Sequence, residues 1–178
     1  MARASAAAPG VHIVRAAPEH LSALPEIERS AARRFAPEDV PPALAAEATP
    51  LETLEGACRE QRLWVALGAD GAPVGFALVA IVDGQPHLEE IDVRPEDAGR
   101  GIGRALIEAV CEAARAEGHR ALTLTTFSHV PWNGPFYARA GFRVLAPSQL
   151  GPGLAARLAA EAQRGPDPAR RVAVPRAP

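Results

Sequence analysis

The chain has 178 residues, of which 48% are hydrophobic and 22% are charged, and its formal net charge is -2. These values are typical of one globular domain. They argue against a disordered chain, a collagen-like fibre and a bundle of membrane helices. Because nucleic-acid binders usually carry a basic excess, we expect no nucleic-acid partner.

The N-terminal region and the cysteines indicate where the protein acts. The apolar stretch within residues 1–10 is shorter than the roughly 7–15 residues of a signal-peptide core, and no apolar run reaches the roughly 18 residues of a membrane span. Cys58 and Cys111 form no Cys-x-x-Cys pair. Two cysteines could form one disulfide, but the pattern favours reduced thiols. All 19 basic residues are Arg, which indicates a GC-rich bacterial genome. We therefore expect a cytoplasmic protein without a membrane partner, with a flexible tail over residues 1–10 and one domain over residues 11–178.

The periodicity of apolar residues predicts strands and helices that alternate along most of the chain. No internal repeat is visible, so we expect one mixed α/β layer structure. The predicted strands cover residues 11–16, 63–69, 74–82, 87–93, 121–127, 142–145 and 171–174, with Asp-Gly turns at residues 70–71 and 83–84. The predicted helices cover residues 18–35, 51–60, 101–117, 135–140 and 150–164.

The predicted strand over residues 87–93 has an irregular pattern. Its apolar positions, Leu88, Ile91 and Val93, break the strict alternation once. An extra residue of this kind is what a β-bulge inserts.

A glycine-rich segment separates this strand from the following helix. Gly99, Gly101 and Gly103 stand there at alternate positions. Glycine lets a ligand approach the backbone closely, and the amides at a helix start lack helical partners and carry partial positive charge. The segment therefore predicts a phosphate or diphosphate site, to which Arg100 and Arg104 add charge. The spacing matches neither a Walker loop, which needs Lys, nor a dinucleotide Gly-x-Gly-x-x-Gly fingerprint, and a plain turn that starts a helix is the alternative.

Two motifs resemble those of the GCN5-related N-acetyltransferases. Val93-x-Pro95, followed by Gly101-x-Gly103-Arg104-Ala105-Leu106, is similar to the acyl-CoA loop of that family. The run Pro131-Trp132-Asn133-x-Pro135-Phe136-Tyr137-x-Arg139-x-Gly141-Phe142 is similar to its second motif. The resemblance spans at least residues 63–145. The sequence departs from the family at Ala98, where Gln or Arg is usual, and at Val130, where Asn is frequent.

The resemblance implies a fold and an activity. The fold is a single-domain, mixed and mostly antiparallel sheet of about seven strands flanked by helices, with a splay between the fourth and fifth strands. The activity is transfer of an acetyl group from acetyl-CoA to a primary amine of a small molecule or peptide, by direct attack and without a metal. Five His and two Cys in the sequence show no metal-ligand spacing.

The resemblance also implies which residues contact the co-substrate. The pantetheine arm would lie in the splay and pair with the backbone of Ile91 and Val93, and the diphosphate would sit on the amides of Gly99 to Arg104. Asn133 has an alternative interpretation as a helix N-cap. The implied contacts are Ile91, Asp92, Val93, Ala98, Gly99, Arg100, Gly101, Ile102, Gly103, Arg104, Asn133, Phe136 and Tyr137.

The candidate catalytic residues are one tyrosine and two glutamates. By the resemblance, the hydroxyl of Tyr137 donates to the departing thiolate; a core aromatic with a satisfied hydroxyl is the alternative. Glu89 and Glu90 are candidate bases, because paired carboxylates in a cleft can have one pKa raised toward neutrality; a solvated strand face is the alternative. His87 and His129 are weaker candidates.

The acceptor side is less defined in the sequence. The region over residues 18–60 carries several acidic side chains, and an acidic rim would favour a cationic amine, although an ordinary solvated surface has the same composition. A transferase for another short acyl-CoA and a non-catalytic CoA-binding or regulatory domain remain open alternatives, as does a homodimer.

Overall fold

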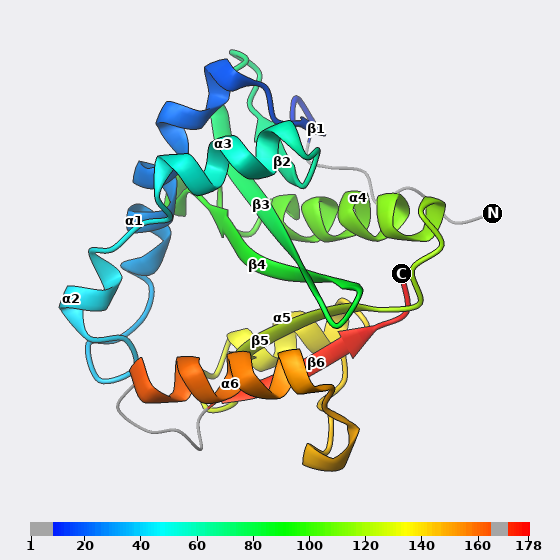
Figure 1. Cartoon of the computed structure of the whole chain (residues 1–178). Helices are drawn as coiled ribbons and strands as arrows, with labels where there is room; N and C mark the ends of the chain where they lie inside the picture. The colour runs from blue at the N-terminus through cyan, green and yellow to red at the C-terminus, as the bar shows by residue number, and fades with distance from the viewer. Residues whose placement is uncertain (1–8, 165–170) are drawn as a thin grey trace.

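The computed structural model describes residues 9–164 and 171–178 (Figure 1). Most of the predicted tail, residues 1–8, lies outside the described residues. The described chain forms a single α/β domain around one six-stranded sheet in the order β1-β2-β3-β4-β5-β6. The strands are β1 (His12–Arg15), β2 (Leu63–Leu67), β3 (Pro73–Val82), β4 (Gln85–Val93), β5 (Leu122–Phe127) and β6 (Arg171–Arg176).

Helices cover both faces of this sheet (Figure 1). Helix α4 lies on one face, while α1 and α3 lie on the other, and α6 runs beside β5 and β6. The α-helices are α1 (Leu24–Ala32), α2 (Pro42–Ala45), α3 (Leu51–Arg59), α4 (Ile102–Ala116), α5 (Asn133–Arg139) and α6 (Pro152–Arg164). Short 3-10 helices cover Pro18–Ala23, Pro95–Asp97 and Pro147–Gln149. The long helix predicted from residue 18 is thus a 3-10 turn followed by α1, and α2 was not predicted.

The predicted strand over residues 142–145 is wrong, and the sheet has six strands instead of about seven. The segment donates two isolated backbone hydrogen bonds to β6, from Arg143 to the Pro175 carbonyl at 3.1 Å and from Leu145 to the Ala173 carbonyl at 2.9 Å. Pro175 has no N–H group, so it cannot return the bond that a regular antiparallel ladder requires at this position.

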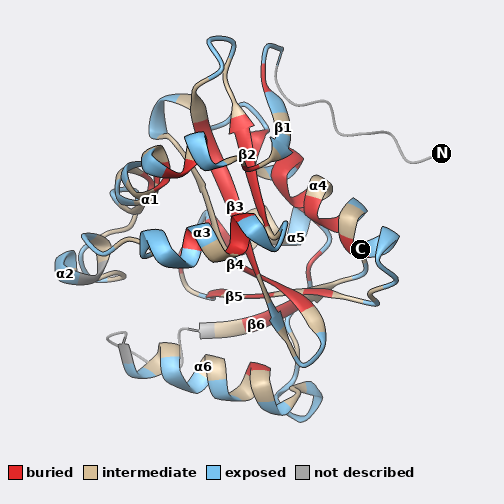
Figure 2. Cartoon of the chain, turned by 45° about the horizontal axis from the view of Figure 1, so that its top comes forward, coloured by how far each residue is buried: buried red, intermediate tan, exposed pale blue. Residues whose placement is uncertain are grey.

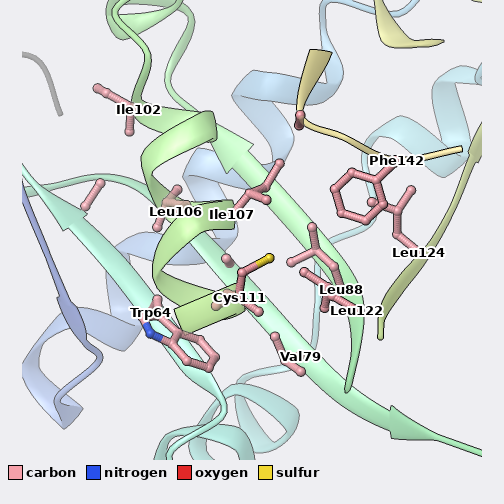
Figure 3. Close-up of a cluster of buried hydrophobic side chains, with 14 of the residues drawn as sticks. Trp64, Val79, Leu88, Ile102, Leu106, Ile107, Cys111, Leu122, Leu124 and Phe142 are labelled. Atoms are coloured by element: carbon pink, nitrogen blue, oxygen red, sulfur yellow. The ribbon is translucent and has the colours of Figure 1, made fainter. Parts of the chain in front are cut away.

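Two hydrophobic clusters fill the two faces of the sheet. The cluster under α4 includes Leu106, Ile107 and Cys111 of the helix, which pack against Val79 and Leu88 of the sheet (Figure 3). The cluster under α1 and α3 includes Leu24, Ile27, Leu54, Phe76 and Leu78. Strand β3 contributes to both clusters, which explains its nearly continuous apolar sequence. Figure 2 shows the resulting burial along the central strands and the inner side of α4.

The two cysteines lie in different clusters and are not bonded to each other. Cys111 is in the cluster under α4, and Cys58 is in the cluster under α1 and α3. Both thiols are free and buried, as the reduced state predicts.

The predicted bulge is confirmed in β4. The register between β3 and β4 shifts so that Leu78 faces Glu90 while Val79 faces Leu88, which leaves Glu89 as the extra residue. The parallel pairing of β4 with β5 covers only His87 with Thr123 and Leu88 with Leu124. Beyond Leu88 the two strands separate, which is the splay expected between the fourth and fifth strands.

Strands β3 and β4 approach each other closely at Gly75. A Cβ at this position would lie 2.7 Å from the carbonyl oxygen of Asp92, a distance that Cβ atoms essentially never show. We expect Gly75→Ala to lower the free energy of unfolding by about 1–3 kcal/mol, as overpacking typically does. Denaturant unfolding would measure this loss.

The control for this variant is Gly134→Ala. A Cβ at Gly134 would meet nothing within 4 Å, and the residue is helical, so stability should be kept or slightly increased. Equal stability of Gly75→Ala and the wild type would contradict the close approach.

Candidate functional site

A cleft of about 1660 Å3 runs along the splay between β4 and β5. The ends of β4 and β5, the glycine turn before α4, and parts of α1, α5 and α6 line it. Of the predicted site residues, every one except Arg100 lines this cleft. Arg100 instead forms an ion pair with Asp97. The sequence prediction therefore brought together residues that the fold places around one space.

The glycine turn has the backbone geometry of an anion site. Gly99 and Gly101 both have φ of +78°, and a Cβ at either position would meet nothing within 4 Å. Gly101 is the N-cap of α4 and supplies no side-chain acceptor to the helix, so the first amides of α4 lack internal partners. Alternating left-handed and right-handed residues make a concavity of N–H groups that binds anions. Gly99 and Gly101 thus fit the predicted diphosphate site.

Gly103 has a different structural role. A Cβ at Gly103 would lie 3.3 Å from the ring of Phe136. The third glycine therefore permits the close packing of α4 against α5, which holds the second motif beside the first.

Helix α5 carries the aromatic residues of the second motif. The half-buried Tyr137 lines the cleft, and its ring makes edge contacts with Phe136 at 5.0 Å and Phe142 at 5.8 Å between centroids. These contacts fix the direction of the phenol ring.

Asn133 is not the N-cap of α5. The cap is Trp132, which makes no side-chain cap bond, and Asn133 is the first helical residue. Its side chain is buried and its Oδ1 accepts a hydrogen bond from the Thr126 hydroxyl at 3.0 Å. The side chain therefore links α5 to β5 instead of serving the helix amides, which corrects the N-cap interpretation.

Helix α6 forms one wall of the cleft, and side chains hold it to the strands. The contacts are Asp83 accepting from the amides of Gly153 at 2.8 Å and Leu154 at 3.0 Å, Arg157 pairing with Glu89 at 2.7 Å, and Thr125 donating to Glu161 at 2.6 Å. The wall is thus attached to the β3–β4 turn, to β4 and to β5.

The two predicted bases have different surroundings. Glu89 is the bulged residue, and its carboxylate is engaged by Arg157. Glu90 stands opposite Leu78 in the ladder, so it shares the face of the sheet that α1 and α3 cover. The Arg157 guanidinium occupies the Glu89 carboxylate oxygen that would have to reach the amine, which makes Glu89 the less suitable base of the two.

Asp92 lies on the same face as Glu90 and has an unusual environment. Its Oδ2 is buried and has no hydrogen-bond partner among the described residues. Burial, with the nearby negative charge of Glu28 as a second cause, raises the pKa of Asp92 to about 8. A carboxyl group that changes protonation near neutral pH inside a cleft is typical of a functional site.

Glu28, on α1, is one of the acidic residues of the 18–60 region, but it was not singled out as a site residue from the sequence. It lines the cleft and accepts hydrogen bonds from the Thr49 amide at 2.8 Å and the Thr49 hydroxyl at 3.3 Å. Burial raises its pKa, and the bonds from Thr49 oppose that rise. A signal was present, because Glu28 occupies the i+4 position of the stripe formed by Leu24, Ile27 and Ala31.

The two candidate histidines have partners of their own. His87 is buried and its Nδ1 lies 2.8 Å from the Thr123 hydroxyl; burial lowers its pKa to about 4. His129 Nε2 lies 2.5 Å from Asp39 Oδ1. Over residues 9–164 and 171–178, no three His, Cys, Asp or Glu side chains gather as metal ligands. Within the same described ranges, no helix has the length and apolarity needed to cross a bilayer.

Comparison with protein families decides the membership of the chain. Residues 25–142, well over half of the chain, match the sequence profile of the acetyltransferase (GNAT) family. The chain belongs to the GNAT family. This confirms the resemblance found in the two motifs, and the matched range contains the glycine turn, the splay and α5.

Solved structures show the same fold as this GNAT domain. An N-acetylglutamate synthase from Neisseria gonorrhoeae, complexed with coenzyme A and N-acetyl-glutamate, superposes with a TM-score of 0.68 at 16% identity over 94% of this chain and 35% of that one. A GNAT-family acetyltransferase from Staphylococcus aureus superposes with a TM-score of 0.67 at 15% identity, over 94% of this chain and 98% of the other. At these identities the likeness concerns the fold.

Curated relatives of the GNAT domain match over shorter stretches. Streptothricin acetyltransferase of Streptomyces lavendulae is 41% identical over 66 residues, which are 36% of this chain and 35% of that protein. Peptidyl-lysine N-acetyltransferase YjaB of Escherichia coli is 32% identical over 91 residues, or 51% of this chain and 56% of that protein. The chain thus matches between about a third and a little over half of these two relatives.

The raised pKa of Asp92 has a consequence for stability. The folded protein keeps a proton on Asp92 up to pH of about 8, whereas the unfolded chain loses it near the ordinary value of 3.8. Because the native state then binds more protons, this group's contribution to stability falls as the pH rises between these two values. We expect the melting temperature of Asp92→Asn, measured relative to that of the wild type at the same pH, to increase as the pH rises from 5 to 9.

Thermal melting at several pH values measures this difference. The matched control is Glu112→Gln, an exposed acid on α4, for which the difference from the wild type should stay constant. A pH-independent difference for Asp92→Asn would contradict the raised pKa.

Proposed function

We propose that the chain transfers an acetyl group from acetyl-CoA to a primary amine of a small molecule or peptide, by direct attack of the amine. The observation that carries this proposal is the turn of Gly99 and Gly101, which opens the first amides of α4 toward the cleft. Similar structures that contain coenzyme A, among them a PaiA N-acetyltransferase from Thermoplasma acidophilum, support the proposal. Family membership supports the same reaction class.

The residues of the cleft fit coenzyme A. The diphosphate would be held by the turn amides, where both left-handed glycines leave open space, with Arg104 at the same wall. Past Leu88, β4 has no strand pairing on its β5 side. This free edge can pair with the amide groups of a pantetheine arm through Ile91 and Val93.

The chemistry requires two proton movements around one bond exchange. Acetyl-CoA supplies an acetyl group activated as a thioester. The amine nitrogen loses a proton and forms a bond to the carbonyl carbon, and the carbon–sulfur bond breaks. Tyr137 donates to the sulfur that leaves as a thiolate, and a carboxylate on the face of β4 that carries Glu90 receives the proton of the amine.

The proposal assigns this activity to the domain over residues 11–178. Because free, buried thiols are typical of a reducing compartment, Cys58 and Cys111 support the proposed cytoplasmic location. The streptothricin and peptidyl-lysine acetyltransferases that the chain resembles support an amine acceptor.

The diphosphate placement predicts the effect of Gly101→Asp. The substitution puts a negative charge where the diphosphate belongs, at a residue with φ of +78°. We expect the affinity for coenzyme A to fall at least about tenfold, which corresponds to about 1.4 kcal/mol. Titration calorimetry with coenzyme A measures this change.

A matched control separates charge from backbone strain. Gly118→Asp places the same side chain at φ of +79° after the other end of α4, where a Cβ also meets nothing within 4 Å. It should lose similar stability and keep its affinity for coenzyme A. Equal affinity losses in the two variants would overturn the placement.

The role of Tyr137 predicts a kinetic effect of Tyr137→Phe. General acid assistance is typically worth about 10²–10⁴-fold, and a thiol is already a good leaving group, so we expect kcat to fall by about tenfold to a hundredfold. Coenzyme A affinity should change little, because the interaction strengthens mainly in the transition state. Steady-state kinetics and a melting curve on the same variant decide the matter. An unchanged kcat with a lowered melting temperature would make Tyr137 a structural residue.

A further inference from the structure

Two acidic side chains from different elements face the same part of the cleft. In the β3–β4 ladder, Asp92 stands opposite Phe76, and Phe76 belongs to the cluster that packs under α1. Asp92 therefore points to the α1 side of the sheet, where Glu28 lies. Both residues line the cleft.

The pair is incomplete without a hydrogen-bond donor. Buried polar atoms normally have partners, yet Oδ2 of Asp92 has none among the described residues. Glu28 is held in place by two donors from Thr49. Ionisation of both carboxyl groups in a buried site is unfavourable, because the two negative charges repel each other and lose hydration, unless a cation binds between them. An ammonium group supplies the missing charge and three N–H donors.

The other charged groups near the pair are already engaged or are negative. Arg29, next to Glu28 on α1, favours the ionised form of Glu28 and also pairs with Glu26. Arg157 is bound to Glu89 on the bulge. Strand β3 contributes apolar residues at this point, and Glu90 shares the face. Arg34, which also lines the cleft, lies over the ring of Trp132, and Glu47 is a further acid of the lining. Once Asp92 loses its proton, a ligand can supply the cation that the ionised pair lacks.

We propose that Glu28 and Asp92 together form the ammonium subsite of the acceptor, and that Asp92 is the group that takes the proton of the bound amine. The inference rests on the proposed acetyl transfer and narrows its substrate class to amines that enter as cations. The ammonium gives its first proton to Asp92, the freed lone pair forms the nitrogen–carbon bond, and the carbon–sulfur bond breaks. The second proton of the attacking nitrogen replaces the one that Tyr137 donates to the leaving thiolate, so coenzyme A leaves as the thiol. Asp92 then returns the proton to water. Glu28 binds the ammonium, and its negative charge helps to raise the pKa of Asp92. Thr49 is a positioning residue, because it donates hydrogen bonds to Glu28.

This assignment predicts a specific pH dependence with a cationic amine such as phenylethylamine. Asp92 must be ionised to accept a proton, so kcat/KM of the wild type should rise with pH up to about 8. Asp92→Asn should lose at least about a hundredfold in kcat/KM, as expected for a general base, together with this limb. Glu28→Gln removes a negative charge that raises the pKa of Asp92, so its limb should move to lower pH.

Three comparisons make the test specific. The same amine serves for all variants, so a shifted limb cannot come from the ionisation of the substrate. Thr49→Val removes the hydroxyl donor that lowers the pKa of Glu28 and should raise KM for the amine with little change in kcat. Glu55→Gln is the matched control, since Glu55 on α3 is exposed and does not line the cleft, and it should behave as the wild type.

A second measurement does not depend on turnover. Carbon-13 NMR of labelled aspartate should follow the ionisation of Asp92 in the protein without acetyl-CoA. Butylammonium should lower the pKa of Asp92 in the wild type, because a cation stabilises the ionised pair, and should do so less in Glu28→Gln. Failure of the wild type to acetylate any amine would overturn the proposed function, and the NMR result would still decide whether an ammonium subsite exists. Unchanged pH profiles in Glu28→Gln and Asp92→Asn, or an Asp92 that ignores butylammonium, would overturn the inference.

Discussion

The separation of β4 from β5 after Leu88 determines the rest of the site. The two strands pair over only two residue positions, and the bulge at Glu89 redirects β4 at that point. The edge of β4 that faces β5 therefore has no strand partner after Leu88, although its other edge is paired with β3. The cleft, the turn before α4 and the wall made by α6 all lie along this opening.

The bulge also sorts the side chains of β4 between the two faces. Ile91 and Val93 pack against the cluster under α4, while Glu90 and Asp92 turn to the side of α1. The strand thus contributes apolar anchoring to one layer and acidic groups to the other. In a regular strand, alternation from Leu88 would have placed Glu90 and Asp92 on the side of α4 and Ile91 and Val93 on the side of α1.

Local patterns in the sequence predicted much of this arrangement. The broken alternation of Leu88, Ile91 and Val93 indicates the bulge. Gly99 and Gly101 indicate the turn, because glycine adopts a positive φ without a steric penalty, whereas the role of Gly103 depends on Phe136. The strand over residues 142–145 has a strand-like composition, but its pairing depends on Pro175, more than thirty positions away. The apolar stripe of α1 places Glu28 on the inner side of the helix, but only the packing of α1 on β4 brings it to Asp92. Long-range partners such as Arg157 for Glu89 leave no local trace at either residue.

Helix α6 is attached to the sheet through side chains, whereas the strands are joined by backbone hydrogen bonds. Side-chain bonds to Asp83, Glu89 and Thr125 hold it, whereas the turn before α4 is built from backbone geometry in a distant part of the chain. The two halves of the cleft therefore have separate sequence determinants. Exchange of the cleft-facing residues of α6 can therefore reshape one wall of the cleft while the glycine turn before α4 stays unchanged, which makes this helix a natural starting point for redesign of the cleft.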